Sequence, residues 1–165
     1  MLKRTIFMLT LMLMTYFNFA AAHTMPITET RLGGIDTTCS LGYVKQVYGE
    51  PREKNYFDGV FIHGVTYVYS DYFSVTARVT GESQIAEDDW LVVGYKFTND
   101  ALSTPSGFTV GTPYEEVIFK YGYGVEFNND GRKGHAFTWS DSAVELDFFV
   151  DDNSIITEIY LGTEF

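Results

Sequence analysis

The sequence predicts an α+β fold, in which two tandem helix-plus-antiparallel-meander units form one sheet with both helices on one face. Two observations carry this prediction. Two blocks of sequence recur in the same order along the chain, and each copy is followed by runs in which apolar and polar residues alternate. The folded part is expected to be a single domain over residues 23–165, with repeats at about 32–102 and 106–165.

The first 22 residues are typical of a signal peptide. Lys3 and Arg4 form a basic start, and an apolar run follows over Ile6–Phe19. Ala20–Ala22 supply the small residues that a signal peptidase reads, so cleavage is expected before His23. The apolar run falls short of the roughly 20 residues that a membrane-spanning helix needs. We therefore expect a periplasmic or secreted protein, with an uncleaved anchor as the alternative.

The chain is strongly acidic, with 22 Asp and Glu residues against 11 Lys and Arg residues. Removal of the leader would take away two of the basic residues, which leaves a net charge of −13. Such a charge repels nucleic acids and anionic lipids, because both are bound through cations that neutralise phosphate. Cys39 is the only cysteine, so no intramolecular disulfide can form. We expect a monomer with a protein partner of basic character, no nucleic acid, and no stable membrane insertion after cleavage.

The recurring blocks begin with two short helices that lie 73 residues apart in the sequence. The segments Cys39–Gly49 and Thr112–Gly122 align in this register, so that Val44 matches Val117. Apolar residues in the second segment follow one stripe of a helix; they are Tyr114, Val117, Ile118 and Tyr121. Both matched valines are therefore expected to face the sheet.

The ends of these helices carry capping residues. In the second copy, Thr112 is expected to be the N-cap and Pro113 the first helical residue, and Glu115 would complete a capping box. Gly49 and Gly122 suit a left-handed C-terminal cap, where a side chain would clash.

A second pair of matching blocks follows, Gly64–Asp71 and Gly134–Asp141, with identical Gly, Ser and Asp residues. Alternation then predicts two further strands in each copy; their ranges are Phe73–Thr80, Trp90–Thr98, Val144–Val150 and Ile155–Leu161. Asn129–Gly131 and Asp151–Asn153 are expected to form hairpin turns, because Asn, Asp and Gly tolerate a positive φ.

The helix end Val47–Pro51, followed by a meander and then repeated, resembles the tandem-repeat fold of beta-lactamase inhibitory protein. It is also similar to the single-unit small lipoproteins of outer-membrane barrel assembly. Leu32–Ile35 and Phe108–Val117 resemble the helix-start motif of that family. The resemblance implies protein binding, but the matched positions are structural, so no binding residue is carried over. The chain departs from the family in having one cysteine and, at Asp36–Cys39, no lipidation motif.

The histidines His23, His63 and His135 are too scattered for a zinc site and are interpreted as exposed or hairpin-lining side chains. The stretch Glu126–Gly131 echoes a calcium loop. Phe137 stands where the bidentate glutamate of such a loop is needed, so a hairpin turn is the preferred interpretation. No nucleophile elbow, P-loop or dinucleotide motif occurs.

Three further groups of residues have a structural and a functional interpretation. Cys39, at the start of a helix, is interpreted as a small buried side chain, with a reactive thiol of lowered pKa as the alternative. The acidic runs Glu87–Asp89 and Asp151–Asp152 are interpreted as solvated turns. Seven aromatic side chains are expected mainly between the sheet and the helices; they are Tyr67, Tyr69, Trp90, Tyr95, Phe97, Phe137 and Trp139.

The sequence therefore assigns no catalytic, cofactor-binding or metal-ligating residue, and no cofactor is expected. We interpret the chain as an exported, non-enzymatic protein-binding or envelope-associated module. A hydrolase inhibitor is the more specific version of this interpretation. The alternative is an enzyme or a small-ligand binder that uses the open face of the sheet. A pocket holding an acid–base pair of shifted pKa would favour that alternative, whereas a broad aromatic and acidic face would favour protein binding.

Overall fold

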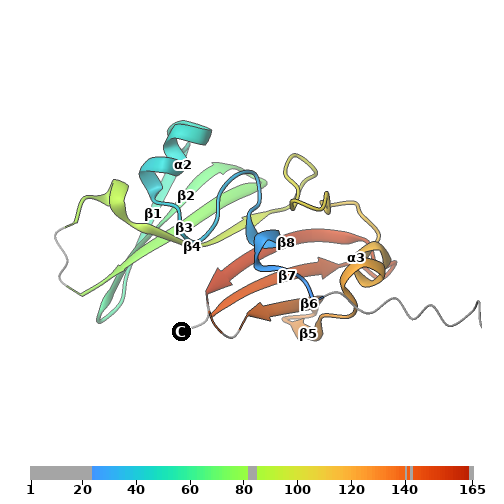
Figure 1. The fold of residues 1–165 in the computed structure, drawn as a ribbon. Helices are drawn as coiled ribbons and strands as arrows, with labels where there is room; N and C mark the ends of the chain where they lie inside the picture. The colour runs from blue at the N-terminus through green and yellow to red at the C-terminus, as the bar shows by residue number, and fades with distance from the viewer. Residues whose placement is uncertain (1–23, 82–84, 140, 142, 164–165) are drawn as a thin grey trace, which may run out of the picture.

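The computed structural model describes residues 24–81, 85–139, 141 and 143–163. One antiparallel sheet of eight strands dominates them, in the spatial order β1-β2-β3-β4-β8-β7-β6-β5 (Figure 1). The strands are β1 (Glu53–Asp58), β2 (Ile62–Ser70), β3 (Phe73–Thr80), β4 (Leu91–Phe97), β5 (Val125–Asn129), β6 (Arg132–Trp139), β7 (Val144–Val150) and β8 (Ile156–Thr163). The α-helices are α2 (Leu41–Tyr48) and α3 (Tyr114–Tyr121), and the 3-10 helices are η1 (Ile27–Thr30) and η2 (Glu87–Asp89). The α+β class is thereby confirmed.

The predicted leader, residues 1–22, and His23 lie outside the described residues. Within the described part of the chain, no helix is long and apolar enough to cross a membrane.

The chain builds the sheet from its two edges towards its middle. After α2, the strands β1 to β4 run in sequence from one edge, and after α3 the strands β5 to β8 run from the other edge. The two last strands, β4 and β8, then pair in the centre with Tyr95 opposite Leu161. β3 and β7 have the predicted bounds. β3 alternates strictly because one face is buried against the core, whereas β7 also buries Asp147 and Phe149 on its other face.

One row of side chains crosses the six inner strands of the sheet and forms the middle of the core. In sheet order the row is Tyr67, Val75, Tyr95, Leu161, Leu146 and Phe137. The first five are almost completely buried, and Phe137 packs against the same cluster. The interpretation of the aromatic residues as core is confirmed, since Tyr69, Trp90 and Trp139 also pack against it and Phe97 is fully buried.

Both α-helices contribute to this one core cluster. Leu41 and Val44 of α2, and Tyr114 and Val117 of α3, are buried in it. Val44 and Val117 are both fully buried, as their matched positions predict. In Figure 1, α2 lies over the half of the sheet formed by β1 to β4, and α3 over the other half.

The capping box predicted for the second helix is wrong. The helix begins one residue later than expected, with Pro113 as the N-cap, and no side chain caps it. The hydroxyl of Thr112 accepts a hydrogen bond from the backbone N–H of Thr109 (3.2 Å), so it is not available to a capping box with Glu115. The carbonyl oxygen of Thr112 accepts from the N–H of Ile156 (3.0 Å), which ties this residue to the last strand rather than to the helix.

The two C-terminal caps share one backbone conformation, which is not the left-handed helical one expected. Gly49 has φ 81° and ψ −167°, and Gly122 has φ 81° and ψ −171°. This combination of positive φ and extended ψ is open almost only to glycine. The N–H of Gly49 donates to the carbonyl of Lys45, and that of Gly122 to Ile118, both over 2.8 Å.

Each helix start is bonded to the beginning of the last strand of its half. In each half, the N–H of the first helical residue donates to a carbonyl just before the last strand. The carbonyl two residues before the helix then accepts from an N–H two residues further along that strand. The four bonds are Leu41 N to Trp90 O (2.9 Å), Val92 N to Cys39 O (2.9 Å), Tyr114 N to Ser154 O (2.8 Å) and Ile156 N to Thr112 O (3.0 Å).

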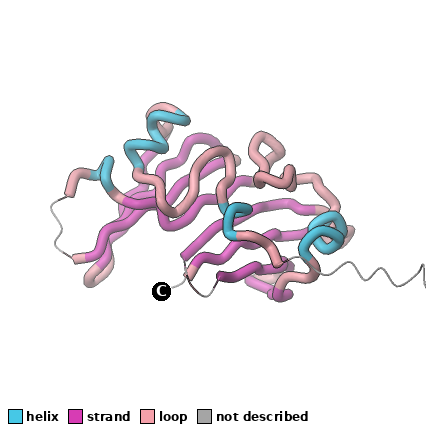
Figure 2. Tube along the Cα trace, in the orientation of Figure 1, coloured by secondary structure: helices cyan, strands magenta, loops and turns pink. Residues whose placement is uncertain are grey.

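The N-terminal strap, residues 24–31, contacts the second half of the sheet as well as the half that follows it in sequence, where the carbonyl oxygen of Thr30 accepts a hydrogen bond from the hydroxyl of Tyr95 (Figure 2). Met25 is buried, and its carbonyl oxygen accepts a hydrogen bond from the indole N–H of Trp139 (3.0 Å). Glu29 is also buried and accepts from the hydroxyl of Ser106 (2.7 Å). The strap therefore connects the two halves on the helix side.

Candidate functional site

The hairpin of β1 and β2 carries the candidate site. All six residues of β1 are exposed, although the strand is fully paired with β2 on one side. Four large apolar or aromatic side chains of this hairpin are exposed; they are Tyr56, Phe57, Val60 and Phe61, here called the hairpin surface. A cluster of this kind, on an otherwise acidic chain, is typical of an interaction site.

The tip of the hairpin is the most exposed part of this surface. Val60 is 89% and Phe61 76% exposed to solvent. Backbone bonds nevertheless hold the tip, since the N–H of Gly59 donates to the carbonyl of Ile62 (2.7 Å) and the N–H of Gly81 to that of Phe61 (3.0 Å). Two apolar side chains are therefore presented to solvent from a fixed backbone.

The two aromatic residues on β1 point to opposite faces of the hairpin. Tyr56 pairs with Val65, a core residue, and so lies on the helix side of the sheet. Phe57 lies on the outer face, where its ring covers Gly64, its partner on β2. The hairpin surface thus extends over both faces and the tip.

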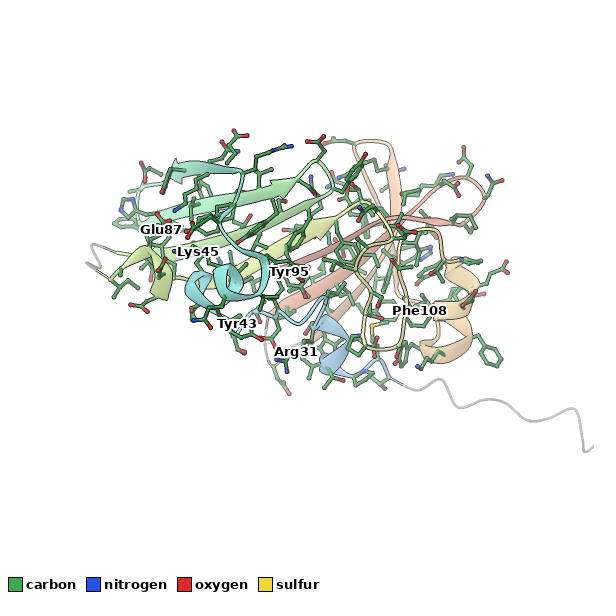
Figure 3. All side chains as sticks on the ribbon, turned by 90° about the horizontal axis from the view of Figure 1, so that it is seen from above. Arg31, Tyr43, Lys45, Glu87, Tyr95 and Phe108 are labelled. Atoms are coloured by element: carbon green, nitrogen blue, oxygen red, sulfur yellow. The ribbon has the colours of Figure 1, made fainter. Side chains whose placement is uncertain are left out.

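Glu87 fixes the helix-side face of the hairpin to η2. Its carboxylate accepts hydrogen bonds from the ammonium of Lys54 (2.7 Å), the hydroxyl of Tyr56 (2.7 Å) and the hydroxyl of Tyr67. On the neighbouring residue, Asp88 pairs with Lys45 of α2. Figure 3 shows Glu87 and Lys45 near each other at the end of the sheet away from Phe108.

These contacts shift the titration of Glu87. Burial alone would raise the pKa of its carboxyl group, but the bonds from Lys54, Tyr67 and Tyr56 outweigh burial and lower the pKa to about 2. Burial, followed by the bond to Glu87, raises the pKa of the Tyr67 phenol. The carboxylate is therefore ionised and fully engaged, and the interpretation of Glu87–Asp89 as a solvated turn is wrong for Glu87. Sequence reasoning missed it because its partners are 20 to 33 residues away along the chain.

The two described histidines, His63 and His135, do not come together, because they lie on β2 and β6 in opposite halves of the sheet. His63 lies at the hairpin, where its Nδ1 is 2.7 Å from a carboxylate oxygen of Asp58. His135 is half-buried rather than exposed, and its ring stacks on Tyr114 with centroids 4.0 Å apart. Burial lowers the pKa of His135, and its Nδ1 has no hydrogen-bond partner among the described residues. His135 thus has a packing role under α3.

Cys39 is not the N-cap of its helix. Ser40 is, and its hydroxyl accepts from the N–H of Tyr43 (3.3 Å). Burial raises the pKa of the Cys39 thiol, and the nearby carboxylate of Asp36 adds to the rise. The alternative interpretation of Cys39 as a reactive thiol of lowered pKa is therefore wrong.

The stretch that echoes a calcium loop forms the predicted turn between β5 and β6. Asp130 and Gly131 have positive φ values of 51° and 83°, and the side chain of Asn128 accepts from the N–H of Gly131 (3.0 Å). Over the described ranges, no group of three or more His, Cys, Asp or Glu side chains is placed to hold a metal ion. Asp151 likewise caps the turn between β7 and β8, accepting from the N–H groups of Asn153 and Ile155 (both 2.9 Å).

Two other places have features that an enzyme would use. A groove of about 450 Å³ lies along β6 to β8, where Arg132 stacks on Phe149 (4.2 Å) and pairs with Glu158 (3.1 Å). The guanidinium of Arg132 and the carboxylate of Glu158 are therefore already engaged in contacts within the protein.

The second place is the hydroxyl of Ser106, which lies between the carboxylate of Glu29 (2.7 Å) and the ammonium of Lys120 (2.7 Å). Lys120 donates to this oxygen, so it is not arranged as a base for a nucleophilic serine. Glu29 also accepts from the backbone N–H of Ser106 (3.3 Å), which anchors the loop to the N-terminal strap.

Comparison with known proteins does not assign the chain to a family. No protein-family model matches the chain, and no curated protein matches it. The solved structures that are similar include YjgB, a DUF4309 family protein from Bacillus subtilis, with 13% identity and a TM-score of 0.45. That match covers 76% of this chain and 78% of YjgB. Another is a protein from Streptococcus mutans described as a candidate beta-lactamase inhibitor, with 12% identity, a TM-score of 0.31, and coverage of 76% and 84%. Both likenesses are too low to contribute to the function proposed below.

Proposed function

We propose that the chain is an exported, non-enzymatic protein-binding module, and that the hairpin surface is its binding site. The observation that carries this proposal is the exposure of Tyr56, Phe57, Val60 and Phe61 on one hairpin with a fixed backbone. A hairpin whose backbone is already ordered before binding loses less entropy when a partner covers its side chains. Export to the periplasm or the extracellular space rests on the leader, residues 1–22.

The scaffold behind this site is, in our proposal, a tandem repeat of two helix-plus-meander units over about residues 32–102 and 106–165. The pairing of the central strands supports it, because Tyr95 opposite Leu161 and Phe97 opposite Ile159 are equivalent pairs on either side of Lys96 and Tyr160. The matching helix-to-strand bonds and the shared conformation of Gly49 and Gly122 support it as well. Both helices would then serve the same face of one single-domain sheet.

A pull-down tests the binding function. Mature protein, beginning at His23, is the bait in an envelope or culture fraction of the native host. We expect one partner that also binds the purified bait as a purified protein. Replacing Val60 and Phe61 together by serine should abolish retention, whereas Phe119→Ser should preserve it. Phe119 is the matched control, because it is an aromatic side chain of α3 that is 85% exposed and far from the hairpin in sequence.

Two outcomes would contradict the proposal. Retention that is equal for the parent and the hairpin variant would move the binding site elsewhere. Turnover of a small substrate by the purified protein, unaffected by the hairpin variant, would favour the enzyme interpretation and the outer face of the sheet.

A further inference from the structure

The two outer hairpins of the sheet differ in one respect that the fold does not require. Phe57 pairs with Gly64 on the β1–β2 hairpin, and Phe127 pairs with Gly134 on the β5–β6 hairpin. Both phenylalanine rings cover their glycine partner, so the two hairpins have the same register. Each hairpin has the same number of residues between its phenylalanine and its glycine. Every residue at the tip of one hairpin therefore has a corresponding residue at the tip of the other.

At the tip, the aligned residues have opposite chemistry. Val60 and Phe61 correspond to Asp130 and Gly131, which form a turn with positive φ and no apolar side chain. Asp-Gly is the residue pair that such a turn favours. The scaffold therefore closes this hairpin without apolar residues, and their presence at the first tip indicates a contact outside the chain.

The charges around the hairpin indicate the character of that contact. Three cations around the hairpin are paired with carboxylates: Lys45 with Asp88, Lys54 with Glu87 (2.7 Å) and Arg52 with Asp71 (2.7 Å).

Two carboxylates near the hairpin, those of Glu53 on β1 and Asp89 on η2, have no ion-pair partner among the residues that the structure describes. A partner surface that carries Lys or Arg around the contact would complement them.

We propose, resting on the function proposed above, that Val60 and Phe61 insert as an anchor into an apolar pocket of a folded protein whose rim is basic. The rest of the hairpin surface fits a pocket better than a plane, because Tyr56 and Phe57 lie on opposite faces of β1. An anionic lipid surface repels a chain of net charge −11. A second copy of this chain carries the same excess of negative charge.

Photo-crosslinking in the native host tests the anchor. Full-length chain carries benzoylphenylalanine at position 61, at position 53 on the flank of the hairpin, or at position 130 on the corresponding tip. We expect positions 61 and 53 to crosslink to the same protein and position 130 to give no product. With that protein purified, Phe61→Ser should weaken binding about 30-fold, as removal of a buried anchor does, and Phe61→Leu should retain most of the affinity.

The basic rim is tested with the same pair of proteins. Association should slow as salt is raised, and Glu53→Gln with Asp89→Asn should slow it at low salt with little effect at high salt. Asp130→Asn is the control, because it removes a charge from the other hairpin and should leave binding unchanged.

The outcomes separate the anchor from the binding function. A crosslink from position 53 without one from position 61 overturns the anchor and leaves protein binding through the hairpin in place. A crosslink from position 61 to lipid or to a second copy overturns the anchor as stated. Absence of a product from both positions overturns the anchor and the hairpin as a binding site. Binding that is insensitive to salt and to the two charge variants overturns the basic rim.

Discussion

The ring of Phe57 fills the space that a Cβ atom on Gly64, its partner on the neighbouring strand, would need. Phe127 and Gly134 have the same relationship at the other edge of the sheet. An aromatic ring packed on a cross-strand glycine contributes more to pairing than either residue does by propensity.

Alanine at either glycine should therefore destabilise the protein. We expect Gly64→Ala and Gly134→Ala each to lower the free energy of unfolding by about 1–3 kcal/mol, because the added methyl group must displace a ring. Denaturant melts measure this. Gly59→Ala is the control, since a Cβ there meets only ordinary contacts at 3.6 Å and beyond, and it should change stability by less than about 0.5 kcal/mol.

The two buried helix valines should behave alike. Val44→Ala and Val117→Ala each remove two methyl groups from fully buried positions, and each should cost about 1–2 kcal/mol. Val47, which is exposed on α2, provides the control, and its replacement by alanine should be nearly neutral. A severe effect at one buried valine with none at the other would contradict the equivalence of the two halves.

Glu87 should make stability depend on pH in a defined window. Its pKa of about 2 in the folded protein lies below the ordinary 4.5, so the unfolded chain takes up the proton first as pH falls. The stabilisation is complete above pH 4.5 and is lost as pH decreases towards 2. The variant Glu87→Gln should be less stable than the parent by about 1–2 kcal/mol at pH 7, and the difference should shrink below pH 4. Melts of both proteins across this range, with Asp89→Asn as control, provide the measurement.

Cys39 should be a slow nucleophile. Its raised pKa keeps the thiol protonated at neutral pH, so alkylation by iodoacetamide should be slower than that of a free thiol. Asp36→Asn removes a negative charge beside the sulfur and should accelerate alkylation. Freshly purified protein should run as a monomer on a non-reducing gel, and a dominant disulfide dimer would show that the sulfur is more accessible than its burial implies.

The N-terminal strap constrains where the leader can be removed. Mass spectrometry of protein exported by the native host should find an N-terminus within two residues of His23. Deletion through residue 31 should lower the free energy of unfolding by at least about 2 kcal/mol, because it removes the buried side chain of Met25. Deletion of residues 1–22 alone should leave stability unchanged. An intact Met1 in the exported fraction would contradict cleavage.

The sequence predicts best those elements whose pattern is imposed by the core. β3 alternates because one of its faces is buried, and Val44 and Val117 follow a helical stripe for the same reason. β1 gave no such pattern, because an edge strand exposed on both faces has no core to impose it.

The candidate site escaped prediction for a different reason. The exposure of Phe61 follows from its place at a tip, and the role of Glu87 follows from partners on β1 and β2 that local sequence does not reveal. The capping box failed because Thr112 satisfies two requirements of the tertiary structure, a turn bond to Thr109 and a strand bond to Ile156.

In the proposed tandem repeat, the pairing of Lys96 with Tyr160 has a consequence for the origin of the chain. The matched helix-to-strand bonds align Val92 with Ile156, and in that register Lys96 and Tyr160 have the same place in their two halves, so the central strands would meet as a strand meets its own copy across a two-fold axis. Two half-length chains would close the same sheet as an isologous homodimer, joined through their last strands. After fusion of two such genes, the two halves could differ in sequence. The two outer hairpins could then diverge, while the pairing of the central strands was retained.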